Sequence, residues 1–277
     1  MPELPEVEIV RTTLSNHIIG KIIKEIVVLY PQIIRTPTDS EQFKLLLNGK
    51  KLTELNRKGK YLLFTFDDIT LVSHLRMEGK YLYKDLPTIA EPATKHTHLI
   101  FTFTDGTELH YQDVRKFGTM DLVWNRELAN FPALAKLGQE PIAADFDIKK
   151  FTEQLKGRSC TIKQALLNQE IVSGLGNIYV DDSLAKSGIS PLKPAKELTN
   201  AEIKHLTVAM REILEEAIRY GGSTIKSFET IYGKGSMQEH LVVYGQTGKP
   251  CFRCGTPIEK IRVAGRGTHF CPNCQKL

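Results

Sequence analysis

The sequence predicts an α+β protein of several domains, with a β-rich N-terminal part, a helical part and a small C-terminal metal module. Three observations lead to this prediction. Short segments of alternating apolar residues fill much of residues 21–124, a helical apolar period follows from about residue 130, and four cysteines lie close together near the end. A chain of 277 residues has room for more than one domain.

The composition is that of a soluble globular protein, with 41% hydrophobic and 25% charged residues. No run of about 18 apolar residues occurs, so the sequence predicts no transmembrane helix. The first residues also lack the basic region and the apolar stretch of a secretory signal. We therefore expect a protein of the cytoplasm that has no membrane partner.

The net positive charge lies in the C-terminal part of the chain. The whole sequence has 37 basic and 32 acidic residues, a formal net charge of +5. Residues 221–277 contain eight Lys or Arg and three Glu, which accounts for the entire excess, whereas residues 1–220 contain 29 residues of each sign. A local basic region is typical of proteins that bind a polyanion, although a solvated basic tail would have the same composition.

A helix and then a series of short strands are predicted for the first 124 residues. Val7, Val10, Leu14 and Ile18 recur at helical spacing, and Gly20 is a suitable helix end. A short helix is expected at about 40–47. The predicted strands, which turn residues separate, are KIIKEIVVLY, YLLFTF, TLVSHLR, YLYK, HLIFTF, ELHYQ and TMDLVW. Seven strands at this spacing predict a sandwich or a barrel.

Helices dominate the part of the chain after the strands. The shorter predicted helices are DIKKFTEQLKG, TIKQALLNQ and NIYVDDSLAKSG. The clearest helix follows Thr199, which has capping-box spacing to Glu202, and it ends at Gly221. A glycine-rich loop comes next. The predicted boundaries are 1–132 for the β-rich domain, 133–148 for a linker, 149–238 for the helical domain and 239–277 for the metal module.

Four cysteines form two pairs, Cys251-x2-Cys254 and Cys271-x2-Cys274, with sixteen residues between the pairs. Two such pairs suit one tetrahedral Zn²⁺ ion, and an all-cysteine site is structural rather than catalytic. A disulfide framework is the weaker alternative, because nothing in the sequence indicates an oxidising compartment. Cys160 stands alone and is interpreted as a buried or half-buried apolar residue.

The segment between the two cysteine pairs contains a predicted hairpin. A turn at Ala264-Gly265 would place Arg266 at the hairpin tip, with a glycine on each side. An exposed arginine there suits contact with a phosphate or insertion into a DNA groove. A merely solvated turn arginine is the alternative interpretation.

Seven separated stretches make this chain resemble the formamidopyrimidine-DNA glycosylase family. They are MPELPEVE (1–8), RKGKYL (57–62), HLRMEG (74–79), DVRKFG (113–118), GLGNIYVD (174–181), VYGQTGKPC (243–251) and RVAGRGTHFCPNCQ (262–275). Their order and spacing cover essentially the whole chain. The resemblance implies an N-terminal β-sandwich with an N-terminal helix, a helix–two-turns–helix domain and a C-terminal zinc-finger hairpin with one structural Zn²⁺ ion.

The same resemblance implies an activity. Members of the family are bacterial base-excision repair enzymes that remove oxidised purines, such as 8-oxoguanine and formamidopyrimidines, and then nick the strand by β,δ-elimination. The implied partner is damaged double-stranded DNA. We expect a monomer, because the N-terminus and the basic zinc module must face one duplex together.

The resemblance assigns catalytic roles to Pro2, Glu3, Lys60 and Arg266. Removal of Met1 would expose the Pro2 amine as the nucleophile. An α-amine has a pKa of roughly 8, against roughly 10.4 for lysine, so more of it is neutral at pH 7. Its condensation with the sugar gives a cationic iminium, which favours elimination. Glu3 is implied as the general acid and base, Lys60 as the residue that assists β-elimination, and Arg266 as a phosphate contact associated with δ-elimination.

Other positions match family residues that contact DNA. Met77, Arg115 and Phe117 match three side chains that fill the gap left by a flipped nucleotide, and Arg115 would hydrogen-bond the orphaned cytosine. The positions that match contacts with phosphate, or lie near it, are His74, His96, Arg158, Lys163 and Asn177. The residues assigned to lesion recognition are Glu78, Ser223, Thr224 and Tyr244, and a covering loop is expected at about 222–238.

The chain departs from the family pattern at one position. The family commonly has Glu, near the proline amine, at the position of Asp182, so retained but slower activity is expected.

Two alternative functions share part of this pattern. A related endonuclease that prefers oxidised pyrimidines shares Pro2, Glu3 and the zinc finger. The leucine of MPELPE and the set of Met77, Arg115 and Phe117 favour the purine enzyme. The second alternative is a catalytically silent DNA-binding protein with the same scaffold.

Overall fold

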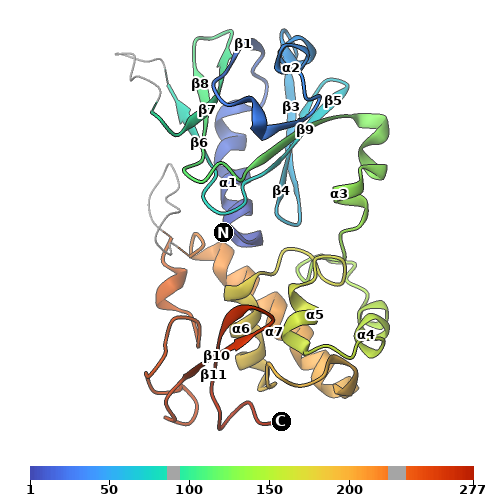
Figure 1. Cartoon of the computed structure of the whole chain (residues 1–277), viewed down its shortest axis with the longest axis vertical. Coiled ribbons are helices and arrows are strands. Elements are labelled where there is room, and N and C mark those ends of the chain that lie inside the picture. Colours follow the sequence, from blue (N-terminus) through green and yellow to red (C-terminus); the bar gives the residue numbers. More distant parts are fainter. Residues whose placement is uncertain (86–93, 224–234) are drawn as a thin grey trace. The chain divides into compact units, whose positions relative to one another are not determined.

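The computed structural model describes residues 1–85, 94–223 and 235–277. Within these ranges the chain forms two compact units (Figure 1). The sandwich unit comprises Met1–Pro2 and Glu6–Ala135. The helical unit comprises Glu3–Pro5, Lys136–Ser223 and Gly235–Leu277.

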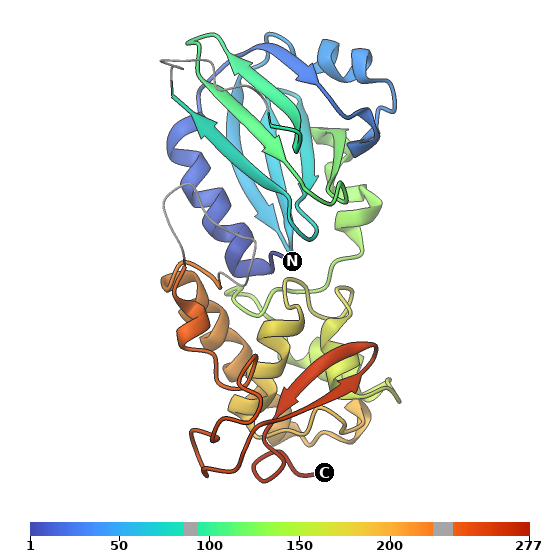
Figure 2. The same cartoon turned by 60° about the vertical axis from the view of Figure 1, so that its left-hand side comes forward.

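The sandwich unit contains two sheets, which lie in layers beside helix α1 (Leu4–Ile18) (Figure 2). The first sheet has the order β1 (Ile23–Val28), β7 (Thr97–Phe103), β8 (Glu108–Gln112) and β6 (Lys80–Lys84), with every pair antiparallel. The second has the order β2 (Ile34–Thr36), β9 (Thr119–Trp124), β5 (Ile69–His74), β4 (Tyr61–Phe66) and β3 (Leu52–Lys58). In this sheet β2 is parallel to β9 and the other pairs are antiparallel. The predicted sandwich is therefore confirmed.

All seven strands and both helices predicted for this part are present, the short helix being α2 (Ser40–Leu47). Strands β2 and β3 were not among the predicted strands. Strand β2 has three residues, too few for a periodic pattern. Strand β3 lies at a sheet edge, so only Leu52 and Leu55 are buried while its other residues face solvent fully or in part. A strand of this kind has too few apolar residues to be distinguished from a loop.

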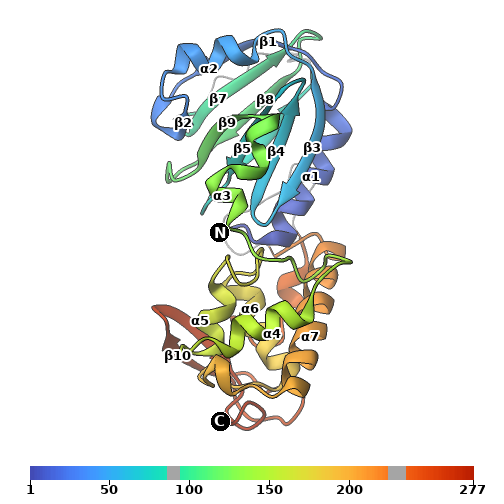
Figure 3. The ribbon, with the colours of Figure 1, turned by 90° about the vertical axis from the view of Figure 1, so that its right-hand side faces the viewer.

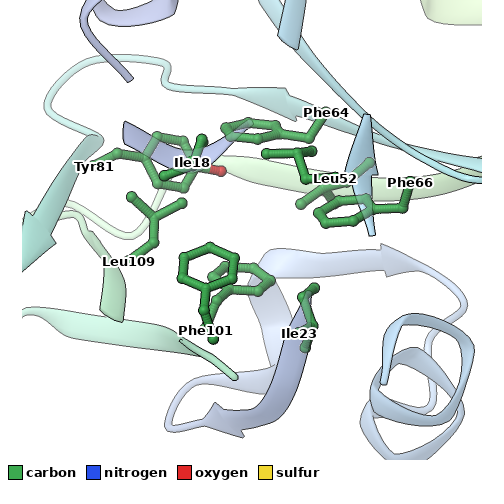
Figure 4. A pocket seen from close by; sticks show the side chains of 10 residues that line it. Ile18, Ile23, Leu52, Phe64, Phe66, Tyr81, Phe101 and Leu109 are labelled. Atoms are coloured by element: carbon green, nitrogen blue, oxygen red, sulfur yellow. The ribbon is translucent and has the colours of Figure 1, made fainter. Parts of the chain in front are cut away.

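One apolar core joins α1 to both sheets, and it includes Val7, Leu14 and Ile18 as the helical period predicted. A void of about 10 Å³ lies inside this core, lined by residues from α1 and from both sheets (Figure 4). Its lining residues include Ile18, Ile23, Leu52, Phe64 and Phe101. A void this small with apolar walls has room for about one water molecule and no polar partner for it, so it is not a ligand site.

The helical unit is built from α4 (Ile148–Lys156), α5 (Ile162–Leu167), α6 (Asn177–Ser187) and α7 (Asn200–Arg219) around a second apolar core (Figure 3). The predicted capping box between Thr199 and Glu202 is present at the start of α7. Strands β10 (Glu259–Val263) and β11 (Arg266–Phe270) form a hairpin that contacts α6. None of the helices in the described ranges is long and apolar enough to cross a membrane.

Short elements complete the two units. They are α3 (Pro132–Ala135) and the 3-10 turns η1 (Pro31–Ile33), η2 (Asn125–Asn130), η3 (Ala195–Glu197) and η4 (Met237–Glu239). The predicted turn of the hairpin is also present. Ala264 and Gly265 both have positive φ, +50° and +74°, which is the backbone of a two-residue type I′ turn.

Replacement of Phe101 by alanine tests the sandwich core. Phe101 is 2% exposed, so Phe101→Ala should lower the free energy of unfolding by about 3–5 kcal/mol through lost burial and a new cavity. Chemical denaturation measures this change. Leu45→Ala is the control, because Leu45 is 76% exposed on α2 and its replacement should change stability by less than about 0.5 kcal/mol. Equal effects of the two substitutions would contradict this description of the core.

Candidate functional site

The carboxylate of Glu3 is held at the N-terminus of helix α6. Its Oε2 accepts a hydrogen bond from the backbone N–H of Gly176 at 2.7 Å, and its Oε1 accepts one from Ile178 at 3.0 Å. These are among the N–H groups that a helix leaves without partners in its first turn, where the helix dipole also favours negative charge. Glu3 is 2% exposed, and Pro2 before it is buried too. The position of the predicted general acid is therefore tightly defined.

Two glycines allow this close approach. A Cβ atom at Gly176 would lie 2.4 Å from the Glu3 carboxylate, and one at Gly174 would lie 2.4 Å from the Leu4 side chain. Gly174 also has a φ of +93°, which disfavours other residues. The GLG sequence before α6 is therefore required by contact with the residues that follow Pro2.

Asn177 and Asp181 connect α6 to the hairpin. Asn177 Nδ2 donates to the carbonyl oxygen of Gly267 at 2.9 Å, and Asp181 Oδ2 accepts from the backbone N–H of His269 at 2.8 Å. Both partners lie on β11, the strand that begins with Arg266. The Asn177 side chain thus contacts protein backbone, and its first-turn position in α6 is as the sequence predicted.

Lys163 does not lie at the surface where a direct phosphate contact would require it. Its side chain is fully buried, and Nζ donates to Asp181 Oδ1 at 2.6 Å and to the carbonyl oxygen of Gly267 at 3.3 Å. Burial lowers the pKa of Lys163, and the negative charge of Asp181 partly offsets this effect. This lysine therefore supports the hairpin from inside the protein, and its place near phosphate stays a prediction.

Asp182 accepts hydrogen bonds from a segment that lies far from it in the sequence. Its carboxylate accepts hydrogen bonds from the backbone N–H groups of Val242, Val243 and Tyr244 at 2.7, 3.1 and 3.0 Å. Burial raises the pKa of this carboxyl to about 6, although these three donors act in the opposite direction. Asp182 therefore fixes the segment 242–244 before the zinc finger, and the retained but slower activity stays a prediction.

Two predicted basic contacts lie on one surface of the helical unit. Arg158 and Arg266 are exposed, and both line an open hollow together with polar side chains that include Gln164 and Asn168. Two guanidinium groups beside uncharged donors are suited to an anion such as a phosphate. The structure thus brings together two residues that are 108 positions apart in the numbering.

In the sandwich unit, Arg115 and Phe117 are exposed on the loop 113–118. The Arg115 guanidinium lies 4.7 Å from the centre of the Phe117 ring, and Phe117 is 52% exposed. Buried Asp113 organises the loop, because its carboxylate accepts from the backbone N–H groups of Arg115, Phe117 and Gly118 at 3.0, 2.8 and 2.8 Å. Asp113 was not among the predicted site residues, although an aspartate that begins a polar loop is a known turn signal.

His74 is buried at the end of β5, and its imidazole is neutral. Its Nδ1 accepts from the backbone N–H of Arg76 at 2.9 Å, which leaves the proton on Nε2. Burial, with smaller effects from the charges of Arg76 and Lys60, lowers the pKa of His74 to about 3. Any contact of His74 with a phosphate would therefore be a neutral hydrogen bond. Lys60 is itself 5% exposed.

The remaining predicted residues are distributed over both units. Met77, Glu78 and His96 are half-buried in the sandwich unit. In the helical unit Ser223 is buried, and the half-buried Tyr244 ring lies edge-on to His269, with ring centres 4.8 Å apart. Thr224 and the rest of the predicted covering loop as far as residue 234 lie outside the described residues.

The four clustered cysteines fit a zinc ion. Their Sγ atoms lie within 4.8 Å of one another, with 4.0 Å between Cys251 and Cys274 and 3.6 Å between Cys254 and Cys271. A tetrahedron with Zn–S bonds of about 2.3 Å has S···S edges of about 3.8 Å, whereas a disulfide requires about 2.05 Å. Cys251 and Cys254 would therefore hold the ion from a turn, and Cys271 and Cys274 from the residues after β11.

Comparison with known proteins gives matches over the whole chain. Residues 1–120 match the model of the formamidopyrimidine-DNA glycosylase N-terminal domain, residues 137–229 match the H2TH domain of the same glycosylase, and residues 248–277 match the zinc finger found in FPG and IleRS. The sequence is 52% identical to formamidopyrimidine-DNA glycosylase of Halalkalibacterium halodurans and 47% identical to that of Geobacillus kaustophilus, with 100% of each chain covered in both comparisons.

Solved structures of protein–DNA complexes are also similar. A Lactococcus lactis FPG mutant bound to Fapy-dG-containing DNA has a TM-score of 0.93 and 46% sequence identity to this chain. MutM bound to DNA that contains carbocyclic 8-oxo-G has a TM-score of 0.92 and 46% identity. Both comparisons cover 100% of this chain and of the matched chain.

Replacement of Cys271 by serine tests the metal site. Cys271→Ser removes one of four thiolates, so the zinc content should fall from one ion per chain to near none, as measured by elemental analysis of the purified protein. Cys160→Ser is the matched control, since Cys160 lies outside the four-cysteine cluster, and this variant should retain its zinc. Loss of zinc from both variants would contradict the assignment of the ligands.

The buried His74 predicts a pH dependence of stability. The folded chain keeps this imidazole neutral down to about pH 3, whereas the unfolded chain protonates it below about pH 6.5. The unfolded state therefore binds more protons within this window, and the free energy of unfolding falls as the pH is lowered. At pH 5 this loss is about 2 kcal/mol.

His74→Asn is the variant that isolates this effect, because asparagine keeps an acceptor near Nδ1 and does not titrate. Denaturation of both proteins at about pH 7.5 and about pH 5 should show a loss of stability that is smaller in the variant by about 2 kcal/mol. The same pH dependence in both proteins would show that His74 is not held neutral.

Proposed function

The chain belongs to the formamidopyrimidine-DNA glycosylase family, and from this premise we propose that it excises oxidised purines from double-stranded DNA and then cleaves the strand at the resulting abasic site. The substrates are 8-oxoguanine and ring-opened formamidopyrimidines. The observation that carries this proposal is the buried Glu3 carboxylate, held by α6 directly beside Pro2 in the chain. The reaction needs an amine and an adjacent acid, and these two residues supply both.

The chemistry proceeds through the N-terminal amine. After Met1 is removed, the Pro2 nitrogen attacks C1′ of the flipped nucleotide, and the damaged base leaves with the electron pair of the glycosidic bond. Glu3 accepts the proton that the Pro2 nitrogen loses and delivers it to the sugar ring oxygen, so that the bond between this oxygen and C1′ breaks. The ring-opened sugar and Pro2 then form a cationic iminium. This cation accepts electrons as the C2′ proton is lost and the 3′ phosphate leaves, and Lys60 assists this elimination. A second elimination releases the 5′ phosphate, with Arg266 as its contact.

The exposed residues account for DNA binding. The hollow that contains Arg158 and Arg266 is suited to the phosphate backbone, in agreement with the basic C-terminal part of the chain. Exposed Phe117 and half-buried Met77 fill the gap in the base stack, and Arg115 hydrogen-bonds the orphaned cytosine. His74 and Asn177 add neutral donors near phosphate, and Lys163 acts only through the hairpin it supports.

Recognition of the damaged base itself is assigned to four residues, by their match to the family. They are Glu78, Ser223, Thr224 and Tyr244. His96 is assigned to the phosphate contacts by the same match to the family. In this proposal one chain binds one duplex.

Reductive trapping tests the proposed nucleophile. Borohydride should convert the iminium on an 8-oxoguanine duplex to a stable protein–DNA adduct, which denaturing electrophoresis and intact mass detect. A chain with one additional residue before Pro2 has an amide there, so it should bind the same duplex and give no adduct. Pro2→Gly, which keeps a free α-amine, distinguishes loss of the amine from loss of the proline ring.

Two results would contradict the proposal. An extended chain that still gives the adduct would exclude the Pro2 amine as the nucleophile. Faster incision of thymine glycol than of 8-oxoguanine opposite cytosine would favour the pyrimidine-specific alternative.

A further inference from the structure

Tyr111, on strand β8, has a fully buried hydroxyl that no function described above uses. The residue is 0% exposed, and its hydroxyl has no hydrogen-bond partner within the described ranges of the chain. An unpaired buried hydroxyl destabilises the folded state, and phenylalanine would keep the packing of the ring without this effect. Burial also raises the pKa of the phenol, so the group remains neutral. A role other than stability is therefore needed to explain the hydroxyl.

The hydroxyl oxygen occupies the place of two missing side chains. A Cβ atom at Gly79 would lie 2.3 Å from this oxygen, and one at Gly118 would lie 1.8 Å from it. Gly79 ends the turn that carries Met77, and Gly118 ends the loop that carries Arg115 and Phe117. Two loops that are far apart in the sequence thus meet at one atom.

Each loop also has a hydrogen bond that holds its backbone, and each contains a non-glycine residue with positive φ. Arg76, before Met77, has a φ of +52°, and Lys116, between Arg115 and Phe117, has a φ of +57°. Non-glycine residues adopt such angles only where the surrounding structure imposes them. The Gly79 N–H donates to the Leu75 carbonyl at 3.0 Å, and Asp113 holds the second loop as described above. Tyr111 is the contact that both loops share.

We propose that Tyr111 is a positioning residue for reading the base opposite the lesion. Its hydroxyl acts as a spacer that sets the separation between the loop of Met77 and the loop of Arg115 and Phe117. This inference rests on the function proposed for these three side chains. Since a hydrogen bond weakens over a few tenths of an ångström, a small movement of the Arg115 loop would alter discrimination between opposite bases without preventing DNA binding.

The first test replaces the hydroxyl alone. Tyr111→Phe should lower the ratio of 8-oxoguanine excision opposite cytosine to excision opposite adenine by about tenfold, while its melting temperature stays the same or rises. Tyr81→Phe is the matched control. The Tyr81 ring lies 5.0 Å from that of Tyr111, but its hydroxyl donates to Ser73 at 2.8 Å. This control should lower the melting temperature and leave the excision ratio unchanged.

The second test replaces the spacer. In Gly118→Ala combined with Tyr111→Phe, the new methyl group enters the space that the hydroxyl leaves. Its Cβ would lie 2.9 Å from the ring Cζ, so the ring must shift slightly, and the ratio should recover in part relative to either single variant. Gly79→Ala combined with Tyr111→Phe should not restore the excision ratio, because the Leu75 carbonyl oxygen would still lie 2.5 Å from the new Cβ.

The outcomes separate this inference from the proposed function. A wild-type protein that does not excise 8-oxoguanine would overturn the proposed function. A wild type that excises it equally opposite both bases would overturn the role of Arg115 on which this inference rests. A discriminating wild type with an unchanged ratio in Tyr111→Phe would overturn only the role of Tyr111. So would a Gly118→Ala and Tyr111→Phe double variant that discriminates no better than the worse single variant.

Discussion

The hydrogen bonds from the start of α6 to the Glu3 carboxylate are the interaction on which the helical unit depends. Most of α6 is buried, and a buried helix terminus needs partners for its free N–H groups. The Glu3 carboxylate accepts hydrogen bonds from these N–H groups, and the same carboxylate is the group that the proposed chemistry needs. This one contact therefore gives the N–H groups at the start of α6 their hydrogen-bond partner and orients Glu3, which follows Pro2 in the chain.

The same helix organises the C-terminal module through its acidic residues. Asp181 accepts from the backbone of β11 and pairs with Lys163, while Asp182 accepts from three successive N–H groups at 242–244. Buried charges are tolerated only when they are paired or fully hydrogen-bonded, and both acids meet this condition. The exposed Arg266 can therefore stand on a hairpin whose base is fixed from inside the protein, and zinc completes a module that is too small to form its own core.

The sandwich unit uses a comparable arrangement with different groups. Exposed side chains, such as Arg115 and Phe117, lie on a loop whose backbone is held by buried Asp113, and buried Tyr111 contacts both of the loops involved. The side chains proposed to contact DNA thus lie on loops, while the residues that hold these loops, Asp113 and Tyr111, are buried.

The sequence by itself determined seven strands of the sandwich, the main helices, the hairpin turn and the cysteine cluster, because each depends on a local period, a turn preference or a ligand spacing. The family motifs added the candidate residues. Only the tertiary structure decided where charged residues lie. Lys163 and Asp182 are of residue types that are usually found at the surface, yet both are buried, because groups distant in the sequence pair or hydrogen-bond with them. Edge strand β3 and the contact of Tyr111 with two glycines likewise depend on packing, which no local pattern encodes.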